Sequence, residues 1–299
     1  MTKEKKLDQF YTRSDIAKMF VSIINIMKPL SEFDMVIEPS AGSGNILEYL
    51  PEDSIGLDLE PKSRRYNDRL ILKQDFFKYK SPYHPLHYNI DIACIGNPPF
   101  GKGYMNPLAK GFFNHAATFS NVIAFIVPAK WHSSYKVQKQ LDDDFGLYYS
   151  ELLPKKSFVF MDKLYNVNCC MQIWSKYPLK KYKNLRIVKK PSTTHEDFDM
   201  FLTCDGVPKR DEVFEQLKQK KYWKFGLKYW GKIGLCELKD IPLNTTTHFL
   251  IAPKKKYVRK ILEQIVWSKY VHNMGAPNIG GKSILVKAYE EMKQEMKIQ

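Results

Sequence analysis

Residues 33–45 read FDMVIEPSAGSGN. An apolar strand in this stretch ends at an acid, Glu38, and a turn of small residues follows. Gly42 and Gly44 let the backbone adopt positive φ and come close to a ligand, and the pattern predicts a helix over residues 45–49. Glycines after a strand are often only a turn. In this order, however, strand, acid, glycine loop and helix are typical of a nucleotide loop after the first strand of an α/β sheet.

Two further strands follow, and each ends in an acid. Residues 55–60 read IGLDLE, and Asp58 lies twenty residues after Glu38, where a carboxylate suits two ribose hydroxyls. Residues 71–77 read ILKQDFF, in which Asp75 can accept from an adenine amine and Phe76 can pack on the ring. The third glycine of the dinucleotide fingerprint GxGxxG is absent, so that motif is excluded.

A stiff turn follows the next apolar run. Residues 90–96, IDIACIG, predict a buried strand, and Asn97-Pro98-Pro99-Phe100 comes directly after it. Two consecutive prolines fix two φ angles, which can hold the Asn97 side-chain oxygen and a neighbouring backbone carbonyl as two acceptors. An exocyclic amine has two N–H donors to match them, and Phe100 can stack on its ring. The plain alternative is that Pro-Pro only terminates the strand.

With these motifs in order, the sequence resembles the S-adenosylmethionine-dependent N6-adenine methyltransferases of the amino-methylating class. The resemblance covers residues 8–175 and implies S-adenosylmethionine as cofactor. Asn97 to Phe100 match the catalytic motif, so Asn97, Pro98, Pro99 and Phe100 are the expected catalytic residues. The residues that the resemblance assigns to cofactor binding are Phe10, Tyr11, Thr12, Glu38, Pro39, Ala41, Gly42, Gly44, Asn45, Asp58, Leu59, Asp75, Phe76 and Asn97.

The motif order resembles the gamma arrangement of this family. The N-terminal motif comes first, the cofactor loop second and the catalytic motif third, which implies a C-terminal target-recognition region. One position departs from the common pattern, because the last residue of the catalytic motif is Phe100 where tyrosine is frequent. A phenylalanine ring can stack on a base as a tyrosine ring does.

The remaining patterns predict the fold class. Strands are expected at 121–128, 147–153 and 168–174, and helices at 14–27, 107–118 and 137–141. Alternating strands and helices favour an α/β fold with a Rossmann-like, seven-stranded methyltransferase sheet. Glu38, Asp58, Asp75 and Asn97 all fall at predicted strand ends, where such sheets bind their ligands.

This pattern predicts a mechanism without metal or catalytic thiol. The methyl sulfonium is already a strong electrophile, so the enzyme has to orient the amine nitrogen and stabilise its developing positive charge. A target adenine within a duplex has to be flipped out of the stack. The expected substrate contacts are Phe100, Phe158 and Lys102, with core packing left open for Phe158 and its neighbour Phe160.

Composition is that of a globular chain in a reducing compartment. The 299 residues are 44% hydrophobic, no apolar run approaches a membrane span, and no signal-peptide core is present. Five cysteines without metal-ligand spacing, Cys94, Cys169, Cys170, Cys204 and Cys236, predict free thiols. The seven histidines form no cluster in the sequence. We therefore expect an intracellular protein, cytoplasmic or nuclear, with no metal site and no membrane association.

Charge divides the chain into two predicted domains. Residues 1–180, the expected methyltransferase domain, carry 23 Lys+Arg and 19 Asp+Glu; residues 181–299 carry 24 and 13, a net charge of +11. Aromatic residues alternate with the lysines at 222–225, 228–230 and 254–257. This composition favours a target-recognition or nucleic-acid-binding region, although a lysine-rich solvated face over an aromatic core would have the same composition.

One further motif is misleading. Residues 276–283, APNIGGKS, match a relaxed phosphate-binding loop, but only 16 residues follow Ser283, too few for the α/β domain that such a loop needs. We interpret the segment as a glycine turn before a C-terminal helix, in which Lys282 can reach a phosphate.

Several functions remain open on the sequence. DNA is the favoured partner, and an RNA adenine-N6 methyltransferase would use the same chemistry. A protein glutamine methyltransferase also fits the two acceptors, because an amide presents the same amine. The last alternative is a catalytically inactive member that serves as a binding subunit. A partner subunit or a homodimer is compatible with the small C-terminal region.

Overall fold

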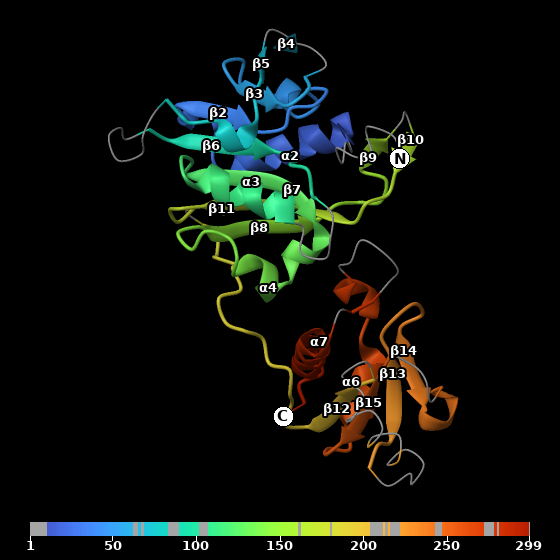
Figure 1. Ribbon diagram of the computed structural model, residues 1–299. Helices are drawn as coiled ribbons and strands as arrows, with labels where there is room; N and C mark the ends of the chain where they lie inside the picture. Colours follow the sequence, from blue (N-terminus) through green and yellow to red (C-terminus); the bar gives the residue numbers. More distant parts are fainter. Residues whose placement is uncertain are drawn as a thin grey trace. The chain divides into compact units, whose positions relative to one another are not determined.

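The computed structural model describes residues 11–61, 65–66, 69–82, 90–101, 107–160, 163–179, 181–203, 212, 215, 222–242, 247–271, 278–279 and 281–298. The chain forms two compact units, Met1–Val188 and Lys189–Gln299 (Figure 1). The division therefore falls inside the Lys-, Pro- and Ser/Thr-containing stretch at 180–192.

An eight-stranded sheet dominates the first unit, in the order β4-β5-β3-β2-β6-β7-β11-β8. The strand bounds are β2 Met35–Glu38, β3 Ile55–Asp58, β4 Arg65–Tyr66, β5 Arg69–Lys73, β6 Ile92–Gly96, β7 Val122–Pro128, β8 Gly146–Leu152 and β11 Cys169–Ser175. Strands β5, β3, β2, β6 and β7 are parallel, and β11 lies antiparallel between β7 and β8.

The predicted fold class is confirmed. Without β4, the seven strands follow the doubly wound order, in which the sheet grows outward in both directions from its first strand, β2. The last strand, β11, returns antiparallel between β7 and β8 and gives the sheet its Rossmann-like methyltransferase form. The short strand β4 pairs antiparallel with β5 at the edge and adds one strand to the seven that we expected.

Three strands of the sheet, β6, β7 and β11, are buried along their whole length and are mainly apolar. Such burial is expected for strands with a continuous hydrophobic run rather than an alternating one. The core around them contains Trp131 and Trp174, whose side chains are almost fully buried.

Two helices of the first unit follow the sequence prediction closely. The helix α2 spans Ser14–Met27, as predicted. Its C-cap, Lys28, has extended backbone because the following Pro29 disfavours helical backbone in the residue before it. The helix α3 spans Pro107–Ala117 and crosses one face of the sheet beside β7 (Figure 1). The remaining helices are α4 Tyr135–Gln138 and the 3₁₀ turns η1 Leu30–Glu32, η2 Leu47–Tyr49, η3 Phe76–Lys78 and η4 Ala129–His132.

Two predicted helices differ from the structure. The helix expected over 45–49 is only the 3₁₀ turn η2, because Leu50 precedes Pro51 and adopts extended backbone (φ −79°, ψ 166°). The helix expected at 137–141 begins earlier, at Tyr135, where the Ser134 hydroxyl caps its first turn by accepting from the Val137 amide.

A small antiparallel sheet of three strands joins the chain's start to its middle. Its order is β1 Tyr11–Thr12, β9 Phe158–Phe160 and β10 Lys163–Tyr165. Thr12 pairs with Phe158, and Arg13 continues the contact through its amide, which donates to the Ser157 carbonyl at 3.1 Å. This pairing fixes the segment that begins at Tyr11 against the first unit.

A four-stranded antiparallel sheet forms the second unit, in the order β12-β15-β13-β14. The bounds are β12 Phe198–Leu202, β13 Phe225–Lys228, β14 Gly234–Glu237, β15 His248–Pro253, η5 Leu238–Asp240, α6 Val258–Gln264, η6 Trp267–Tyr270 and α7 Lys282–Glu295. One face packs on α6 and α7 through Phe249, Ile261 and Leu285, which are fully buried. The helix α7 is the C-terminal helix that we expected after the glycine turn.

A buried carboxylate ties α7 to the second sheet. Asp197, only 1% exposed, accepts hydrogen bonds from the Tyr289 hydroxyl (2.9 Å) and the Lys293 ammonium (2.8 Å). Burial opposes the ionisation of Asp197, but the bonds from Lys293 and Tyr289 outweigh it and hold its pKa below the usual value. The ion pair therefore fixes α7 on the sheet.

Two further expectations concern membrane-spanning helices and the state of the cysteines. None of the helices in the described part of the chain combines the length and the apolar character that a bilayer crossing needs. Cys94, Cys169, Cys170 and Cys236 are free thiols, and the first three are buried. Cys204 lies outside the described residues.

Candidate active site

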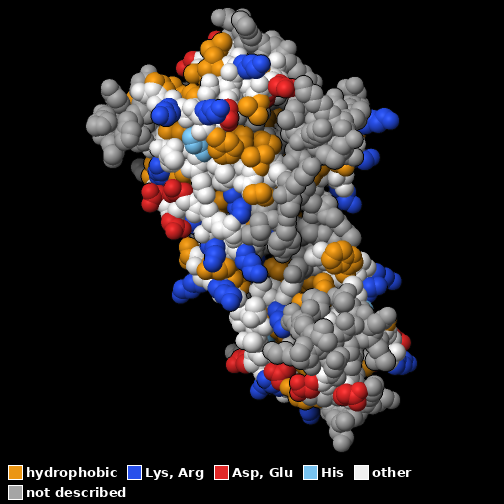
Figure 2. Space-filling view, viewed as in Figure 1, with side chains coloured by type: hydrophobic (Ala, Val, Ile, Leu, Met, Phe, Trp, Pro, Cys, Tyr) orange, Lys and Arg blue, Asp and Glu red, His pale blue; other side chains and the backbone are white. Residues whose placement is uncertain are grey.

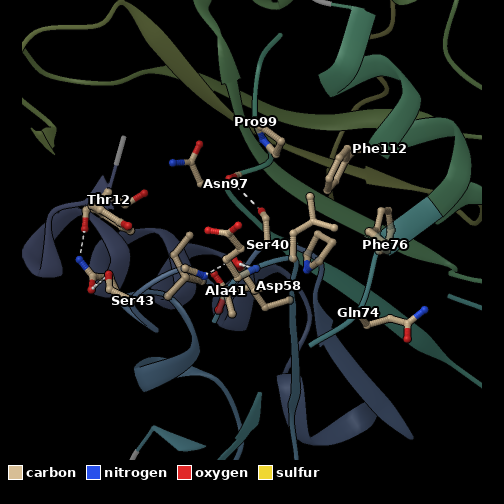
Figure 3. Close-up of a pocket in the computed structure, with 18 of the residues that line it drawn as sticks. Thr12, Ser40, Ala41, Ser43, Asp58, Gln74, Phe76, Asn97, Pro99 and Phe112 are labelled. Atoms are coloured by element: carbon tan, nitrogen blue, oxygen red, sulfur yellow. Dashed lines mark hydrogen bonds between the residues drawn. The ribbon is translucent and has the colours of Figure 1, made fainter. Parts of the chain in front are cut away.

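One pocket lies at the carboxyl ends of β2, β3, β5 and β6 (Figure 3). These strands are parallel neighbours, so their ends meet at one edge of the sheet and bring residues far apart in sequence together. Thirteen of the residues predicted for the site line this pocket: Tyr11, Thr12, Glu38, Pro39, Ala41, Gly42, Asn45, Asp58, Leu59, Asp75, Phe76, Asn97 and Pro99.

Asp58 organises the glycine loop. Its Oδ2 accepts from the Gly42 amide at 2.8 Å, and its Oδ1 accepts from the Glu60 amide at 2.8 Å. Each carboxylate oxygen can accept more than one hydrogen bond, so both oxygens of Asp58 keep a lone pair for a ligand. The ribose acid of the sequence prediction is thus also the residue that holds the loop in place.

Glycine is required at position 42 for two reasons. Its φ is +56°, which lies in the left-handed region, and a Cβ there would lie 3.1 Å from Cε1 of Tyr11. The ring of Tyr11 thus lies directly on the loop backbone. Gly44 also has positive φ, +83°, but it does not line the pocket and acts through the shape of the turn.

Glu38 is the most unusual charged group in the pocket. Its side chain is 2% exposed, and its Oε2 has no hydrogen-bond partner among the described residues. Burial raises the pKa of Glu38 well above its ordinary value; a backbone hydrogen bond from Leu47 opposes this, and the charge of Asp58 adds to it. A carboxyl held in this way favours a cationic or hydrogen-bond-donating ligand.

The burial of the Glu38 carboxylate is expected to lower the free energy of unfolding when Glu38 is ionised. Because the folded pKa is raised, the native state binds more protons than the unfolded state, and stability falls as pH rises above the unfolded pKa of about 4.3. Glu38→Gln removes the ionisation. We expect it to raise the free energy of unfolding by about 1–3 kcal/mol at pH 8 and by less at pH 5, measured by urea unfolding. An equal effect at both pH values would contradict the assignment.

A short chain of hydrogen bonds joins the N-terminal segment to the glycine loop. The Asn45 amide donates to the Thr12 carbonyl at 2.6 Å, and the Ser43 hydroxyl donates to the Asn45 side-chain oxygen at 2.7 Å. The Thr12 Oγ1 is buried and has no hydrogen-bond partner within the described part of the chain. It lines the same pocket and offers a ligand one polar contact.

The Asn97 turn follows β6 and packs on the glycine loop. The Ser40 hydroxyl donates to the Asn97 carbonyl at 3.0 Å, and Figure 3 shows this bond across the pocket. The two loops approach closely at Gly96, where a Cβ would lie 2.9 Å from Cδ of Pro39. Asn97 and Pro99 line the pocket, whereas Pro98 is buried.

Two aromatic residues predicted to contact the substrate lie elsewhere. Phe100 is 5% exposed and Phe158 is fully buried, and both belong to the hydrophobic core. Phe158 pairs with Thr12 across β1 and β9. The structure therefore gives Phe158 the core role that the sequence left open, and it presents no open Phe100 ring to a base. Phe10 and Lys102, which we also predicted for the site, lie outside the described residues.

The far end of the pocket is aromatic. Phe76 is stacked on Phe112 of α3 with ring centroids 4.9 Å apart, and Asp75 caps the turn η3 by accepting from the Phe77 amide at 3.0 Å. Asp75 therefore has a local structural role besides its place in the lining. Phe76 keeps only 2% exposure.

The sequence missed several lining residues, namely Ser40, Ser43, Ile46, Glu60, Gln74, Phe77, Leu108 and Phe112. Ser40 and Ser43 belong to the glycine loop, and small polar side chains in such a loop would have predicted that they line the pocket. Phe112 could not be predicted as a pocket residue, because an aromatic residue on an apolar helix face predicts core packing.

Comparisons with known proteins find similar solved structures and no similar sequences. No protein-family model and no curated protein sequence matches the chain. A structure from Pyrococcus horikoshii, provisionally described as an RNA methyltransferase, shares 16% identity over 58% of this chain and 89% of its own, with a TM-score of 0.43. A type I restriction-modification methyltransferase subunit from Streptococcus thermophilus shares 14% identity over 79% of this chain and 58% of its own, with a TM-score of 0.41.

A third similar structure holds a bound cofactor. The magnesium protoporphyrin IX methyltransferase of Synechocystis, solved with bound S-adenosylmethionine, shares 12% identity over 54% of this chain and 78% of its own, with a TM-score of 0.37. At such values the likeness concerns the fold alone. The fold assignment stands on the chain's own strand order, which is that of a Rossmann-like methyltransferase sheet.

Proposed function

We propose that this protein transfers the methyl group of S-adenosylmethionine to the N6 amine of adenine in DNA. The observation that carries the proposal is that the Asn97 turn and the Asp58-held glycine loop line one pocket. The first element suits a planar amine, and the second suits a nucleoside. Their meeting at one edge of the sheet supports a reaction between the two.

The residues of the pocket fit the cofactor. Asp58 retains acceptor capacity for two ribose hydroxyls, and Asp75 with Phe76 lies where an adenine ring needs an acceptor and an apolar wall. Glu38 and Thr12 offer buried oxygens that lack partners among the described residues, which suits the charged methionine end. Together these groups match the three chemically distinct parts of S-adenosylmethionine.

Asn97 and the Pro98 carbonyl position the amine in this proposal. When bound, S-adenosylmethionine supplies an electrophilic methyl group on a sulfonium. The Asn97 side-chain oxygen and the Pro98 carbonyl would accept hydrogen bonds from the two N–H groups of the substrate amine and so direct the nitrogen lone pair to the methyl carbon. The same two acceptors would stabilise the positive charge that develops on the nitrogen as it takes the methyl group in place of the sulfur, until a proton leaves to water.

The structure changes one part of this proposal. Because Phe100 is buried, stacking on a flipped base falls to other groups near Asn97. Pro99 and Leu108 line the pocket on that side. Positioning by hydrogen bonds, rather than by the Phe100 ring, is therefore the feature that we assign to the catalytic turn.

Charge supports nucleic acid as the partner. Residues 181–299 carry a net charge of +11, and Figure 2 shows groups of Lys and Arg side chains on the described surface of both units, among acidic and hydrophobic ones. An excess of positive charge attracts polyphosphate backbones and raises the rate of encounter. A protein glutamine substrate gives no reason for this charge.

A transfer assay tests the proposal. The full chain is incubated with methyl-tritiated S-adenosylmethionine and, separately, duplex DNA, single-stranded DNA, structured RNA and a glutamine-containing peptide. We expect label in DNA. Label only in RNA would replace the DNA assignment while keeping the chemistry, and label only in the peptide would overturn the adenine assignment.

A further inference from the structure

The hairpin between β13 and β14 carries the most exposed tryptophan of the chain. We define the Trp230 hairpin as residues 228–234, KYWGKIG. Trp230 is 44% exposed, whereas Trp131, Trp174 and Trp223 are buried, at 0%, 1% and 6%. The aromatic residues of the basic region therefore include core residues, such as Trp223 and Phe225, and exposed ones, of which Trp230 is the exposed tryptophan.

The backbone of the hairpin is held in place on both sides. The Tyr229 amide donates to the Thr247 carbonyl at 3.0 Å, and the Ile279 amide donates to the Tyr229 carbonyl at 3.3 Å. Trp230 itself forms an antiparallel bridge with Asn278. An aromatic side chain on a fixed backbone loses less conformational entropy when it binds a ligand than one on a loose loop.

Positive charge flanks the exposed ring. Lys228 and Lys232 are both exposed, and residues 228–234 contain no acid. Within the described part of the chain, neither lysine forms an ion pair. The acid that follows the hairpin, Glu237, is already paired with Arg259 at 2.6 Å. Both lysines are therefore available to an external anion.

The hairpin has open space beside it. A Cβ placed on Gly231 or Gly234 would meet no atom of the described residues within 4 Å. Gly231 also has φ +75°, so the turn needs a residue that tolerates the left-handed region. Within the described part of the chain, the two glycines therefore leave room beside the turn that carries Trp230.

We propose that the Trp230 hairpin is a binding site for single-stranded nucleic acid, in which Trp230 stacks on an unpaired base while Lys228 and Lys232 contact the flanking phosphates. An exposed aromatic plane between two cations matches the alternation of base and phosphate along a strand. A duplex hides its base faces, so stacking of this kind requires an unpaired base. The site lies in the second unit and does not depend on the methyl-transfer assignment.

Binding is tested on the full chain with fluorescein-labelled 12-nucleotide DNA and RNA strands of the same sequence and with the matching duplex. Trp230→Ala is expected to weaken the binding of both single strands by about 5- to 150-fold, the range for losing one stacked base. Trp230→Phe keeps an aromatic plane and should retain most of the affinity. The single strands should also quench wild-type tryptophan fluorescence, and this quenching should be absent in Trp230→Phe.

The lysines are tested through salt dependence. Replacing Lys228 and Lys232 together by Ala should lower the slope of log Kd against log salt concentration by about 1.4, or 0.7 per phosphate contact on a single strand. Trp230→Ala should leave that slope unchanged. This difference separates the stacking residue from the phosphate contacts.

Two control variants match these changes. Tyr222→Ala removes an aromatic residue of similar exposure, 45%, in the same unit, where the neighbouring carboxylate of Asp199 disfavours phosphate. Lys260→Ala removes an exposed lysine of α6. Both should bind like the wild type. Equal losses in Tyr222→Ala and Trp230→Ala, unchanged affinity in Trp230→Ala, or binding to phosphatidylserine vesicles in place of either strand would overturn the proposal.

Discussion

Asn97→Ala is expected to lower the rate of methyl transfer by at least about 10²–10³-fold and to change the Kd for S-adenosylmethionine by less than about threefold. The rate effect is the scale for removing one preorganised group that stabilises a developing charge. Affinity should persist because, in our proposal, the cofactor is held by Asp58 and the glycine loop, and Asp58 is itself fixed by the Gly42 and Glu60 amides.

The measurement combines single-turnover kinetics with calorimetry. Single-turnover rates report the chemical step, and calorimetric titration reports cofactor affinity on the same preparation. An unchanged melting temperature shows that the turn after β6 remains folded. Retained turnover would remove Asn97 from the catalytic role. Loss of both rate and affinity would instead make it a cofactor-binding residue.

Asp58→Ala is expected to weaken the binding of S-adenosylmethionine by about 5- to 150-fold, corresponding to about 1–3 kcal/mol for a charge-assisted hydrogen bond. The loss has two sources. The ribose loses its acceptors, and the Gly42 and Glu60 amides lose the carboxylate that fixes the loop. Asp58→Asn keeps one acceptor oxygen, so its loss should be smaller.

A second acid provides the control. Asp53 is exposed and lies before β3, at the opposite end of that strand from Asp58. Asp53→Ala removes the same charge without touching the pocket and should bind the cofactor like the wild type. Calorimetric affinities that are equal for wild type, Asp53→Ala and Asp58→Ala would show that Asp58 does not contact the ribose.

The sheet could be predicted because its signals are local and strong. Strands such as β7 are uninterrupted apolar runs, and α2 is bounded by a polar start and by Pro29, so periodicity and proline alone predict both. The acids at the strand ends could be placed in one pocket because parallel strands end at one edge. Each of these inferences uses only residues that are close together in the sequence and one rule about the topology of parallel sheets.

The positions that the sequence could not settle have a different origin. Phe100 follows a motif that suggests an exposed ring, and for Phe158 the sequence left substrate contact and core packing open. Tertiary packing places both in the core. Phe112 lines the pocket from a helix whose pattern predicts only core. Among the aromatic residues of the second unit, the sequence cannot separate the buried Trp223 from the exposed Trp230. In all four cases exposure depends on contacts between segments far apart in sequence.

The most direct test of the central claim is the chemical identity of the methylated product. Wild type and Asn97→Ala are incubated with duplex DNA and S-adenosylmethionine that carries a trideuterated methyl group, and the digested nucleosides are identified by mass spectrometry. The account predicts N6-trideuteromethyl-deoxyadenosine from the wild type and a loss of at least about 10²-fold in the variant. Label on a ring nitrogen or a carbon atom, or equal N6 label from both proteins, would contradict it.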